Sequence, residues 1–553
     1  MPSAPAPTRL RSALTARGRQ LRTRTIVERD YRSFQRRYGD ILGRVPSGLE
    51  GTALVASLTH SIFQLKLEGM LAKAFQYRGV EPVAVVPAGT SVPRRYLALF
   101  GVGRFVTLED FLPPDVDEAA AAEADALLSR VATTNDLRPV SFRGAGVGRQ
   151  ALSTASRHLH EGAVDVSDPQ ARDEIRRFLA LAIRTTMAAD GLLDELCPEL
   201  VIFNEMNYAA EGPLSDLALA RGLNTIQFVG GYDDDALVFK RYTAQTKGLH
   251  PRSLSEQSWQ AVRRMPWTPE RDRELDADFA RRYEGTSILA QLNRGWTREQ
   301  SRAEIVRRVG LDPDRKTAVV FSHILWDANM FYGRDLFGDQ EEWFVETVRA
   351  ACATASVNWI VKLHPAQVWK LKRDGATGEL DELAAIREQI GALPAHVHVL
   401  EPTSDISPWS LFELTDFGIT IRGSVGFELP CFGIPALTAG TGFYSGRGFT
   451  VDSESADEYL ERLRGIEETP PPGPEQVVLA RRHAYALFRL RQTRFTSFRS
   501  IYQPLEKIDR PFEATIELTV GSADELERAD DLRRFGEWAV DPSALDYLEP
   551  VPA

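Results

Sequence analysis

Apolar runs alternate with amphipathic stretches along the chain, and they form two similar series. The first series contains four apolar runs that predict buried strands, at residues 51–57, 81–86, 199–203 and 224–229. Two stretches of helical periodicity lie between them, at residues 64–77 and 213–221. Strands that alternate with helices imply a parallel sheet, so this part of the chain predicts a Rossmann-like domain.

The second series repeats this rhythm. Its predicted strands lie at residues 317–322, 358–362, 396–400, 417–421 and 436–438. Predicted helices lie between them at residues 341–354, at 380–390 and from Ser424 onward. Five strands separated in this way predict a second Rossmann-like domain, whose ligand is expected outside the carboxyl ends of the strands.

The predicted fold class is α/β, with two Rossmann-like domains facing a cleft. A polar stretch rich in Arg and Glu separates them, and its Trp259, Trp267 and Trp296 are expected to be packing anchors. The predicted divisions are a basic leader with a helix at 1–50, the N-terminal domain at 51–250, a helical connector at 251–310, the C-terminal domain at 311–474, a crossing helix at 475–509 and an acidic appendage at 510–553.

Composition narrows the class of protein. The chain of 553 residues is 43% hydrophobic and 26% charged, as globular proteins are, and contains no apolar run long enough to span a bilayer. No secretory signal is apparent, so we expect a cytoplasmic protein. The three cysteines lie far apart in sequence, without metal-ligand spacing, and are expected to be reduced and structural.

The charge is distributed unevenly. Residues 1–44 hold eleven Arg and no Lys against three acidic residues, a net charge of +8, which leaves −19 for the rest of a chain whose total is −11. This basic leader either packs on its own domain or contacts an acidic partner or anionic lipid at the inner face of the membrane. Nucleic acid is not expected as a partner, because the chain is acidic and has no basic patch interleaved with aromatic residues.

The first candidate site is Lys362-Leu363-His364-Pro365, at the end of a predicted buried strand. Lys362 and His364 can both donate to phosphate oxygens, while Pro365 stops the strand. A His-Pro pair by itself is equally compatible with a plain turn.

The second candidate site is Arg422-Gly423-Ser424-Val425-Gly426-Phe427-Glu428, directly after a predicted strand. Gly423 and Gly426 would allow a ligand to approach the backbone, and the N-terminus of the following helix would favour a phosphate. Glu428 is placed to accept hydrogen bonds from a ribose, or it is simply an acid in a first helical turn. The spacing matches neither a dinucleotide fingerprint nor a Walker loop.

Two further segments could reach the same ligand. Residues 438–450 contain four glycines after a strand and carry Tyr444, Ser445 and Arg447, which could contact sugar or phosphate unless the segment is a mobile turn. His323 and Asp327 follow the first strand of the second series, where they could touch the ligand or close the cleft.

Taken together, these motifs resemble bacterial capsule polysaccharide biosynthesis proteins. The resemblance covers roughly residues 200–500 and rests on Phe321–Asn329, the helix with Trp343, Lys362–Pro365, Asp405–Pro408 and Arg422–Glu428 through Gly448. It implies a GT-B glycosyltransferase that needs no metal ion, in a family of which some members use CMP-sugars. It also implies that His364 and Pro365 hold the nucleotide phosphate, that Ser424 assists, and that base contacts lie between Pro402 and Trp409.

A transferase of the inverting kind also needs a general base, which in this layout would come from the N-terminal domain. Glu205, just after the strand at 199–203, and Glu211, just before the next helix, are the candidates, although either could instead charge a helix N-terminus. His60 is a third candidate.

The triplet Asp233-Asp234-Asp235 is interpreted as a turn, and no metal ion is expected there. Lys240 and Arg241 would then serve as phosphate partners or pair with those aspartates.

The leading hypothesis is therefore transfer of a sugar from a CMP- or UDP-sugar donor, held by the C-terminal domain, to a surface polysaccharide or lipid-linked glycan. The nucleotide sugar is the substrate, and no cofactor is expected. Two alternatives stay open: a nucleotide-sugar epimerase of the UDP-GlcNAc 2-epimerase type, and a non-catalytic polysaccharide-assembly protein, for which the basic leader is the supporting feature.

Overall fold

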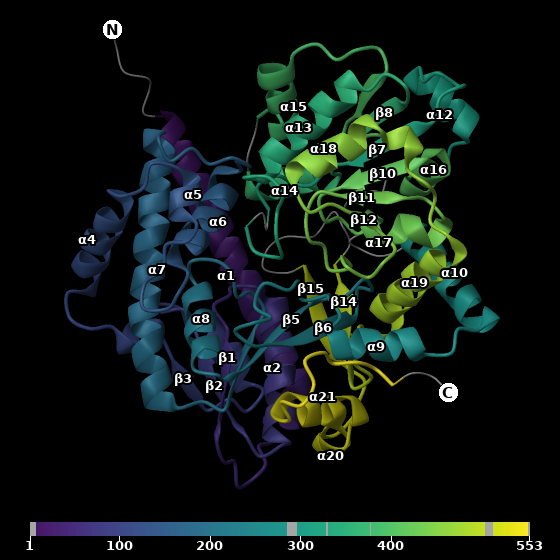
Figure 1. Ribbon diagram of the computed structural model, residues 1–553. Helices are drawn as coiled ribbons and strands as arrows, with labels where there is room; N and C mark the ends of the chain where they lie inside the picture. The colour runs from purple at the N-terminus through teal and green to yellow at the C-terminus, as the bar shows by residue number, and fades with distance from the viewer. Residues whose placement is uncertain (1–6, 285–295, 328–329, 376–377, 504–512, 551–553) are drawn as a thin grey trace. The chain divides into compact units, whose positions relative to one another are not determined.

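The computed structural model describes residues 7–284, 296–327, 330–375, 378–503 and 513–550, with side chains from residue 23 onward (Figure 1). The first six residues of the predicted leader, Ala328 and Asn329 of the quoted motif, and residues 504–512 and 551–553 of the C-terminal region therefore lie outside it. The chain forms two compact units, one of residues 1–107 with 495–541 and one of residues 108–494 with 542–553. None of the described helices is both long and apolar enough to cross a membrane.

The first unit contains the predicted βαβ opening. Strands β1 (Thr52–Ala56), β2 (Glu81–Val85) and β3 (Arg104–Val106) pair in parallel, and helices α2 (Ile62–Gln76) and α3 (Val92–Ala98) connect them. Helix α2 begins where the Ser61 hydroxyl accepts the Gln64 N–H, which satisfies one of the free donors of the first turn. The helix and both predicted strands are confirmed.

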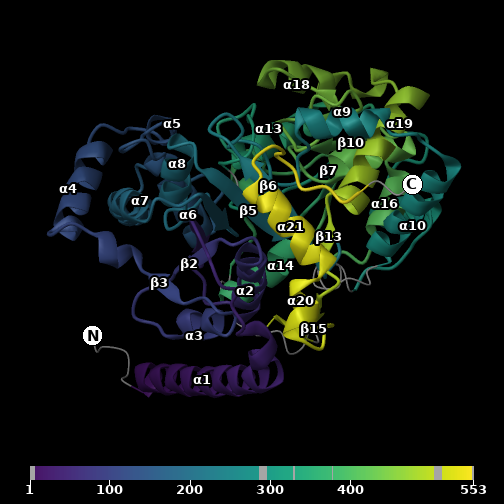
Figure 2. The same cartoon turned by 90° about the horizontal axis from the view of Figure 1, so that it is seen from below.

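The long helix α1 (Pro7–Leu42) packs on this unit through its C-terminal half. Phe34, Tyr38 and Leu42 are buried, and Tyr31 meets the Tyr96 ring of α3 edge-on, with the centroids 5.4 Å apart. Figure 2 shows α1 running below α3. From α2, the fully buried Lys66 reaches Asp30 of α1 at 2.8 Å. The described half of the basic leader is therefore part of the first unit's own packing.

The C-terminal region returns to the first unit. Strands β14 (Phe498–Tyr502) and β15 (Ala514–Leu518) form an antiparallel pair, followed by α20 (Ala523–Glu527) and α21 (Asp530–Val540). The Thr515 hydroxyl of β15 accepts a hydrogen bond of 2.7 Å from Lys66, so one buried ammonium joins α1, α2 and β15.

The second unit opens with helices that the apolar pattern did not predict. They are η1 (Leu108–Phe111), α4 (Val116–Leu128), α5 (Thr134–Leu137), α6 (Val147–Leu159) and α7 (Pro169–Leu196). The predicted elements β4 (Leu200–Phe203), α8 (Gly212–Ala220) and β5 (Asn224–Gly230) then follow, with β4 and β5 parallel. An unpredicted strand, β6 (Ala236–Tyr242), turns back antiparallel to β5.

The second series forms a sheet whose paired strands are all parallel. Its strands are β7 (Thr317–Phe321), β8 (Asn358–Lys362), β9 (Val397–Leu400), β10 (Phe417–Thr420), β11 (Ala436–Thr438) and β12 (Val451–Asp452). They lie in the order β12-β11-β10-β7-β8-β9. The five predicted strands are confirmed, β12 adds a sixth, and the chain is an α/β protein with two Rossmann-like series.

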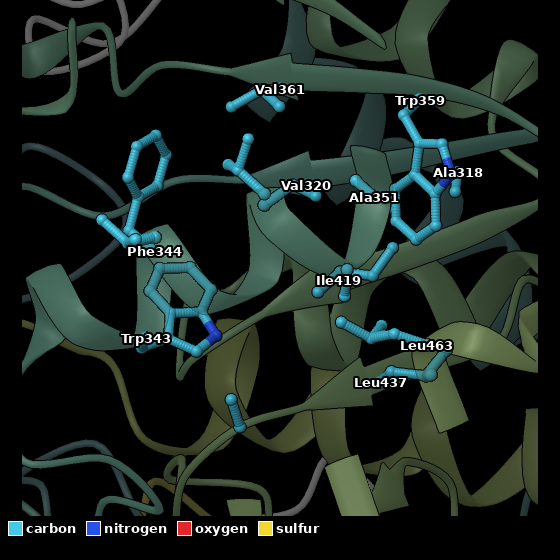
Figure 3. Packing of buried hydrophobic residues seen from close by; sticks show 14 of the residues in the cluster. Ala318, Val320, Trp343, Phe344, Ala351, Trp359, Val361, Ile419, Leu437 and Leu463 are labelled. Carbon is cyan, nitrogen blue, oxygen red and sulfur yellow. The ribbon is translucent and has the colours of Figure 1, made fainter. Parts of the chain in front are cut away.

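Helices cover both faces of this sheet because the interior positions of its central strands β7 and β8 are apolar. Val320 and Val361 face α13 (Gln340–Ala353) and α18 (Ala456–Arg464) in one core, which Figure 3 shows around Trp343 and Trp359. The neighbouring Val319 and Ile360 face the other way, toward α12 (Arg302–Val309) and α16 (Pro408–Leu414). Burial of both faces is typical of doubly wound parallel sheets.

The remaining helices surround the sheet or precede it. They are α9 (Glu256–Arg264), α10 (Pro269–Tyr283), α14 (Ala366–Asp374), α15 (Asp381–Ala385) with η2 (Ile386–Ile390), α17 (Val425–Glu428) with η3 (Leu429–Phe432), and η4 (Ile466–Glu468). In the connector, Trp259 is buried as expected, but Trp296 is exposed, and its ring N–H donates to the Ser404 carbonyl oxygen.

The predicted crossing helix is shorter than expected. Helix α19 (Pro474–Tyr485) ends in a wider turn, η5 (Ala486–Leu490), and β13 (Thr493–Arg494) then pairs with the free edge of β6. The segment does reach the strands of the first series, but it joins them as a strand.

The last described residues belong to the core of the second unit. Asp546 is 4% exposed and lies 2.7 Å from the ammonium of Lys240 and 3.7 Å from the guanidinium of Arg491, both fully buried. The expectation that Lys240 and Arg241 bind phosphate or pair with Asp233–Asp235 is wrong, because Lys240 pairs with Asp546 and Arg241 donates to Asn224.

We expect Asp546→Asn to destabilise the second unit, because it leaves two buried cations without their counter-charge. Removing one partner of a buried ion pair costs about 3–5 kcal/mol. Urea unfolding of the chain measures this loss, and Asp457→Asn at an exposed position of α18 is the matched control, expected to change the free energy of unfolding by less than about 0.5 kcal/mol. Equal stability of the two variants would contradict the role of Asp546.

Candidate functional site

A cavity of about 730 Å³ lies at the carboxyl ends of the second sheet. Residues that end or follow β7, β8, β9 and β10 line it, namely Ser322, His323, Lys362, Leu363, His364, Pro365, Pro402, Thr420, Arg422, Gly423 and Ser424. The neighbouring strands β7 and β10 lie where the strand order reverses. A crevice at such a switch point is where doubly wound sheets bind ligands.

Lys362 brings a positive charge to this cavity without a carboxylate beside it. Its ammonium donates to two backbone oxygens, those of Leu363 and Glu401, each at 3.1 Å. Burial lowers the pKa of Lys362 to about 8. A cation held only by carbonyl oxygens leaves its charge available to an anionic ligand.

His364 presents a fixed N–H group. Its Nδ1 accepts the Ala366 backbone N–H at 3.2 Å, which leaves the proton of a neutral ring on Nε2. Burial lowers the pKa of His364 to about 3, and burial likewise lowers the pKa of His323 to about 4. The two rings, with centroids 6.2 Å apart, are thus neutral imidazoles at physiological pH.

The turn after β10 is held by contacts on both sides. Arg422 is 7% exposed, pairs with Asp335, and donates to the Tyr332 carbonyl oxygen at 2.5 Å. The Gly423 N–H donates to the Thr420 hydroxyl at 3.1 Å. Ser424 and Val425 also line the cavity, as the sequence predicts.

The helix expected after Ser424 is a single turn. Helix α17 has four residues and continues as the 3-10 turn η3, which contains Pro430. Gly426 does not line the cavity. A side chain there would overlap the Tyr444 ring, which is fully buried and donates its hydroxyl to the Gly423 carbonyl oxygen at 2.8 Å. Tyr444 and Gly426 therefore support the turn from behind, and Tyr444 does not line the cavity, contrary to the expectation that it contacts the ligand.

Glu428 lines the cavity but is already engaged. Arg282 donates to one carboxylate oxygen at 2.8 Å, and the Tyr283 hydroxyl donates to the other at 2.7 Å. Arg282 also donates to the Ser424 hydroxyl at 3.2 Å. Sequence reasoning missed both partners because α10 reads as a solvent-exposed, charge-rich helix.

The sequence also failed to predict part of the cavity wall, namely the residues that follow β5 and β6. Tyr232, which follows β5, and His250 and Arg252, which follow β6, line the cavity. The only sequence signal was the pair Gly230-Gly231 after a predicted strand, because β6 itself was not predicted.

One region of the cavity is apolar. Phe321, Ile406, Leu411 and Phe412 line it, together with Pro402, Ser404 and Pro408. The segment predicted to contact a base, Pro402 to Trp409, therefore contributes to the same cavity as Lys362 and Arg422.

The candidate bases lie outside the cavity lining that the described residues form. Glu205 accepts the Met206 N–H at 2.9 Å, and burial raises its pKa. Burial, with the nearby Glu205 charge, raises the pKa of Glu211 to about 8. His60 is exposed after β1 in the first unit.

The aspartate triplet after β5 lines the cavity and faces arginine. Asp233 pairs with Arg494, and Asp235 lies 3.6 Å from the same guanidinium.

Comparison with known proteins adds little beyond the fold. No protein-family model and no curated protein matches the sequence. Solved structures similar to the chain include Thermosulfurimonas dismutans KpsC, a beta Kdo 2,4 transferase, with 14% identity, a TM-score of 0.32, and coverage of 60% of this chain and 87% of that one. The UDP-GlcNAc 2-epimerase of Neisseria meningitidis bound to UDP-GlcNAc has 11% identity, a TM-score of 0.30, and coverage of 79% and 96%. Anabaena HepE in complex with UDP-glucose has 12% identity, a TM-score of 0.27, and coverage of 79% and 94%. At such scores the likeness carries no assignment of function.

The position of Lys362 predicts a pH dependence of anion binding. Its pKa of about 8 means that the side chain is charged below pH 8 and loses its proton above it. We expect the affinity for UMP and CMP to fall as pH rises from 8 to 9.5, by up to about tenfold per unit. Isothermal titration calorimetry at several pH values measures this. Lys362→Arg should bind equally at pH 7 and 9.5, and a parent affinity that stays constant over this range would contradict the assignment.

Proposed function

We propose that this chain is a glycosyltransferase that uses a nucleotide-activated sugar, and that the cavity in the second unit holds the donor. The observation that carries the proposal is the arrangement at the carboxyl ends of β7, β8 and β10, where Lys362 has no carboxylate partner and His364 presents a neutral N–H donor beside an apolar region.

These features match the parts of a nucleotide sugar. Phe321, Ile406 and Phe412 offer a planar base an apolar surface, which binding sites for small ligands commonly provide. The phosphate then lies against Lys362 and the Nε2–H of His364, with the hydroxyl of Ser424 on the neighbouring turn. A phosphate leaving group gains negative charge when the glycosidic bond breaks, and fixed donors stabilise that charge.

The acceptor is proposed to be a growing surface polysaccharide or lipid-linked glycan, in line with the resemblance to capsule polysaccharide biosynthesis proteins. An acceptor hydroxyl loses its proton as it attacks, so a carboxylate on the wall opposite the donor is required. Glu205 and Glu211 remain the proposed candidates, although neither belongs to the cavity lining that the described residues form.

The function is tested first by donor turnover. The purified chain is incubated with a panel of CMP- and UDP-sugars, and release of the nucleotide is measured by chromatography. At least one donor is expected to be hydrolysed slowly without acceptor. Conversion of the sugar to an epimer in that reaction would instead identify an epimerase, and neither binding nor turnover of any donor would contradict the proposal.

The role of His364 is tested by His364→Ala. Loss of one hydrogen bond to a charged group costs about 1.5–3 kcal/mol, so nucleotide affinity should fall by roughly 10- to 100-fold while the melting temperature changes little. His398→Ala, on β9 outside the cavity lining, is the matched control and should bind normally. Unchanged affinity of His364→Ala would remove this residue from the site.

The variants Glu205→Gln and Glu211→Gln test which of the two carboxylates is the general base. Removing the base should lower turnover by about 100-fold or more without changing nucleotide affinity, whereas Glu199→Gln at an exposed position should have no effect. Because the raised pKa of Glu211 keeps it protonated until pH rises through about 8, activity that depends on Glu211 should increase up to that pH. Normal turnover of both variants would exclude both residues.

A further inference from the structure

The cations that line the cavity differ in how their charge is balanced. Arg281 pairs with Asp278, Arg282 with Glu428, and Arg494 with Asp233. Of the cations that line the cavity, Lys362 and Arg252 have no carboxylate within ion-pair distance among the described residues. The donor phosphate proposed above accounts for Lys362, but nothing yet accounts for Arg252.

Arg252 is held in place by neutral groups. Its Nη2 donates to the Gly230 carbonyl oxygen at 2.9 Å, and its guanidinium lies 4.7 Å from the centroid of the Tyr232 ring. Its Nε is buried and has no hydrogen-bond partner within the described chain. A buried donor without an acceptor costs about 1–3 kcal/mol, which a ligand atom accepting from it would recover.

Arg422 contributes a second donor of the same kind. Two of its guanidinium nitrogens reach Asp335 and the Tyr332 carbonyl oxygen, but its Nε is also buried without a partner among the described residues. This guanidinium is more than nine-tenths buried and belongs to the cavity lining.

His250 is close to both of these arginines. Its Nδ1 accepts the Arg252 backbone N–H at 3.1 Å, so the proton of the neutral ring is on Nε2. The ring packs against Tyr332, whose carbonyl oxygen binds Arg422, with the centroids 4.8 Å apart. Burial, together with the Arg252 and Arg422 charges, holds the pKa of His250 well below its usual range.

We propose that His250, Arg252 and Arg422 form a second anion subsite in the cavity, separate from the Lys362–Pro365 turn, which takes a carboxylate or a further phosphate of the bound substrate. The subsite offers three N–H donors. Two are the buried Nε–H groups of Arg252 and Arg422, which have no partner among the described residues, and the third is the Nε2–H of His250. Arg252 also brings a charge that no carboxylate balances. Its place in catalysis rests on the proposed function, but its affinity for an anion does not.

Two parts of a nucleotide sugar could supply this anion. A nucleoside diphosphate carries a second phosphate, whereas an acidic sugar carries a carboxylate. A guanidinium binds either group through a planar pair of donors, so the contact chemistry is shared and the ligand series decides between them.

The test compares the parent chain with Arg252→Gln by calorimetry, using UMP, UDP, UDP-glucose and UDP-glucuronate, and the cytidine monophosphate and diphosphate. If the anion is the second phosphate, Arg252→Gln should lose about tenfold or more in affinity for the diphosphates and little for the monophosphates. If it is a carboxylate, the variant should bind UMP and UDP normally but lose any preference for UDP-glucuronate over UDP-glucose.

Two further variants keep the result interpretable. Arg177→Gln, at an arginine paired with Glu174 outside the cavity lining, is the matched control and should behave as the parent does. Arg252→Lys retains the charge without the planar fork and should fall between the parent and Arg252→Gln. Equal affinities of the parent and Arg252→Gln for every ligand would overturn the subsite.

A titration with inorganic pyrophosphate separates this proposal from the proposed function. If no nucleotide binds the parent chain, the nucleotide-sugar function fails, but pyrophosphate should still raise the melting temperature of the parent and of Arg177→Gln more than that of Arg252→Gln. An equal effect on all three, or none, would overturn the anion subsite by itself.

Discussion

Burial of both faces of the second sheet is the constraint on which the rest of this structure depends. The interior positions of β7 and β8 are occupied by side chains that pack alternately into one helical layer or the other, so the middle of these strands holds no polar side chain. Charged and hydrogen-bonding residues are thereby confined to the strand ends. The carboxyl ends of four parallel strands lie at one edge, and this alone brings His323, Lys362, Pro402 and Arg422 into one cavity.

The same constraint explains which part of the site could be predicted from the sequence. Lys362–Pro365 and Arg422–Val425 follow strands whose apolar runs are unmistakable, so their position at a common edge follows from the fold class. Arg252 and His250 follow β6, an antiparallel strand that mixes Lys240 and Arg241 with apolar residues. Its sequence pattern therefore does not predict a strand. Arg282 lies on a helix that looks solvent-exposed, because the carboxylate that receives it is 146 residues away.

Two sequence expectations failed for reasons of packing that no local pattern contains. Gly426 was expected to admit a ligand, but it admits the Tyr444 ring, which supports the turn from inside the unit. The positive end of a helix was expected after Ser424, but α17 has only one turn. The positive charge and the N–H donors of this wall therefore come from side chains, namely Lys362, the neutral imidazoles and the arginines.

Both units are completed by residues near the C-terminus of this chain, which constrains when each unit can fold. The first unit needs residues 495–541, and the second needs Asp546 to neutralise Lys240 and Arg491. During synthesis on the ribosome, the chain must emerge as far as Asp541 before either unit has all of its parts. Until then the nascent chain exposes apolar strand edges and uncompensated charge, the condition in which newly made proteins aggregate or need chaperones. Premature termination shortly before residue 546 would therefore damage the unit that holds the cavity, although every residue of the cavity would already be present.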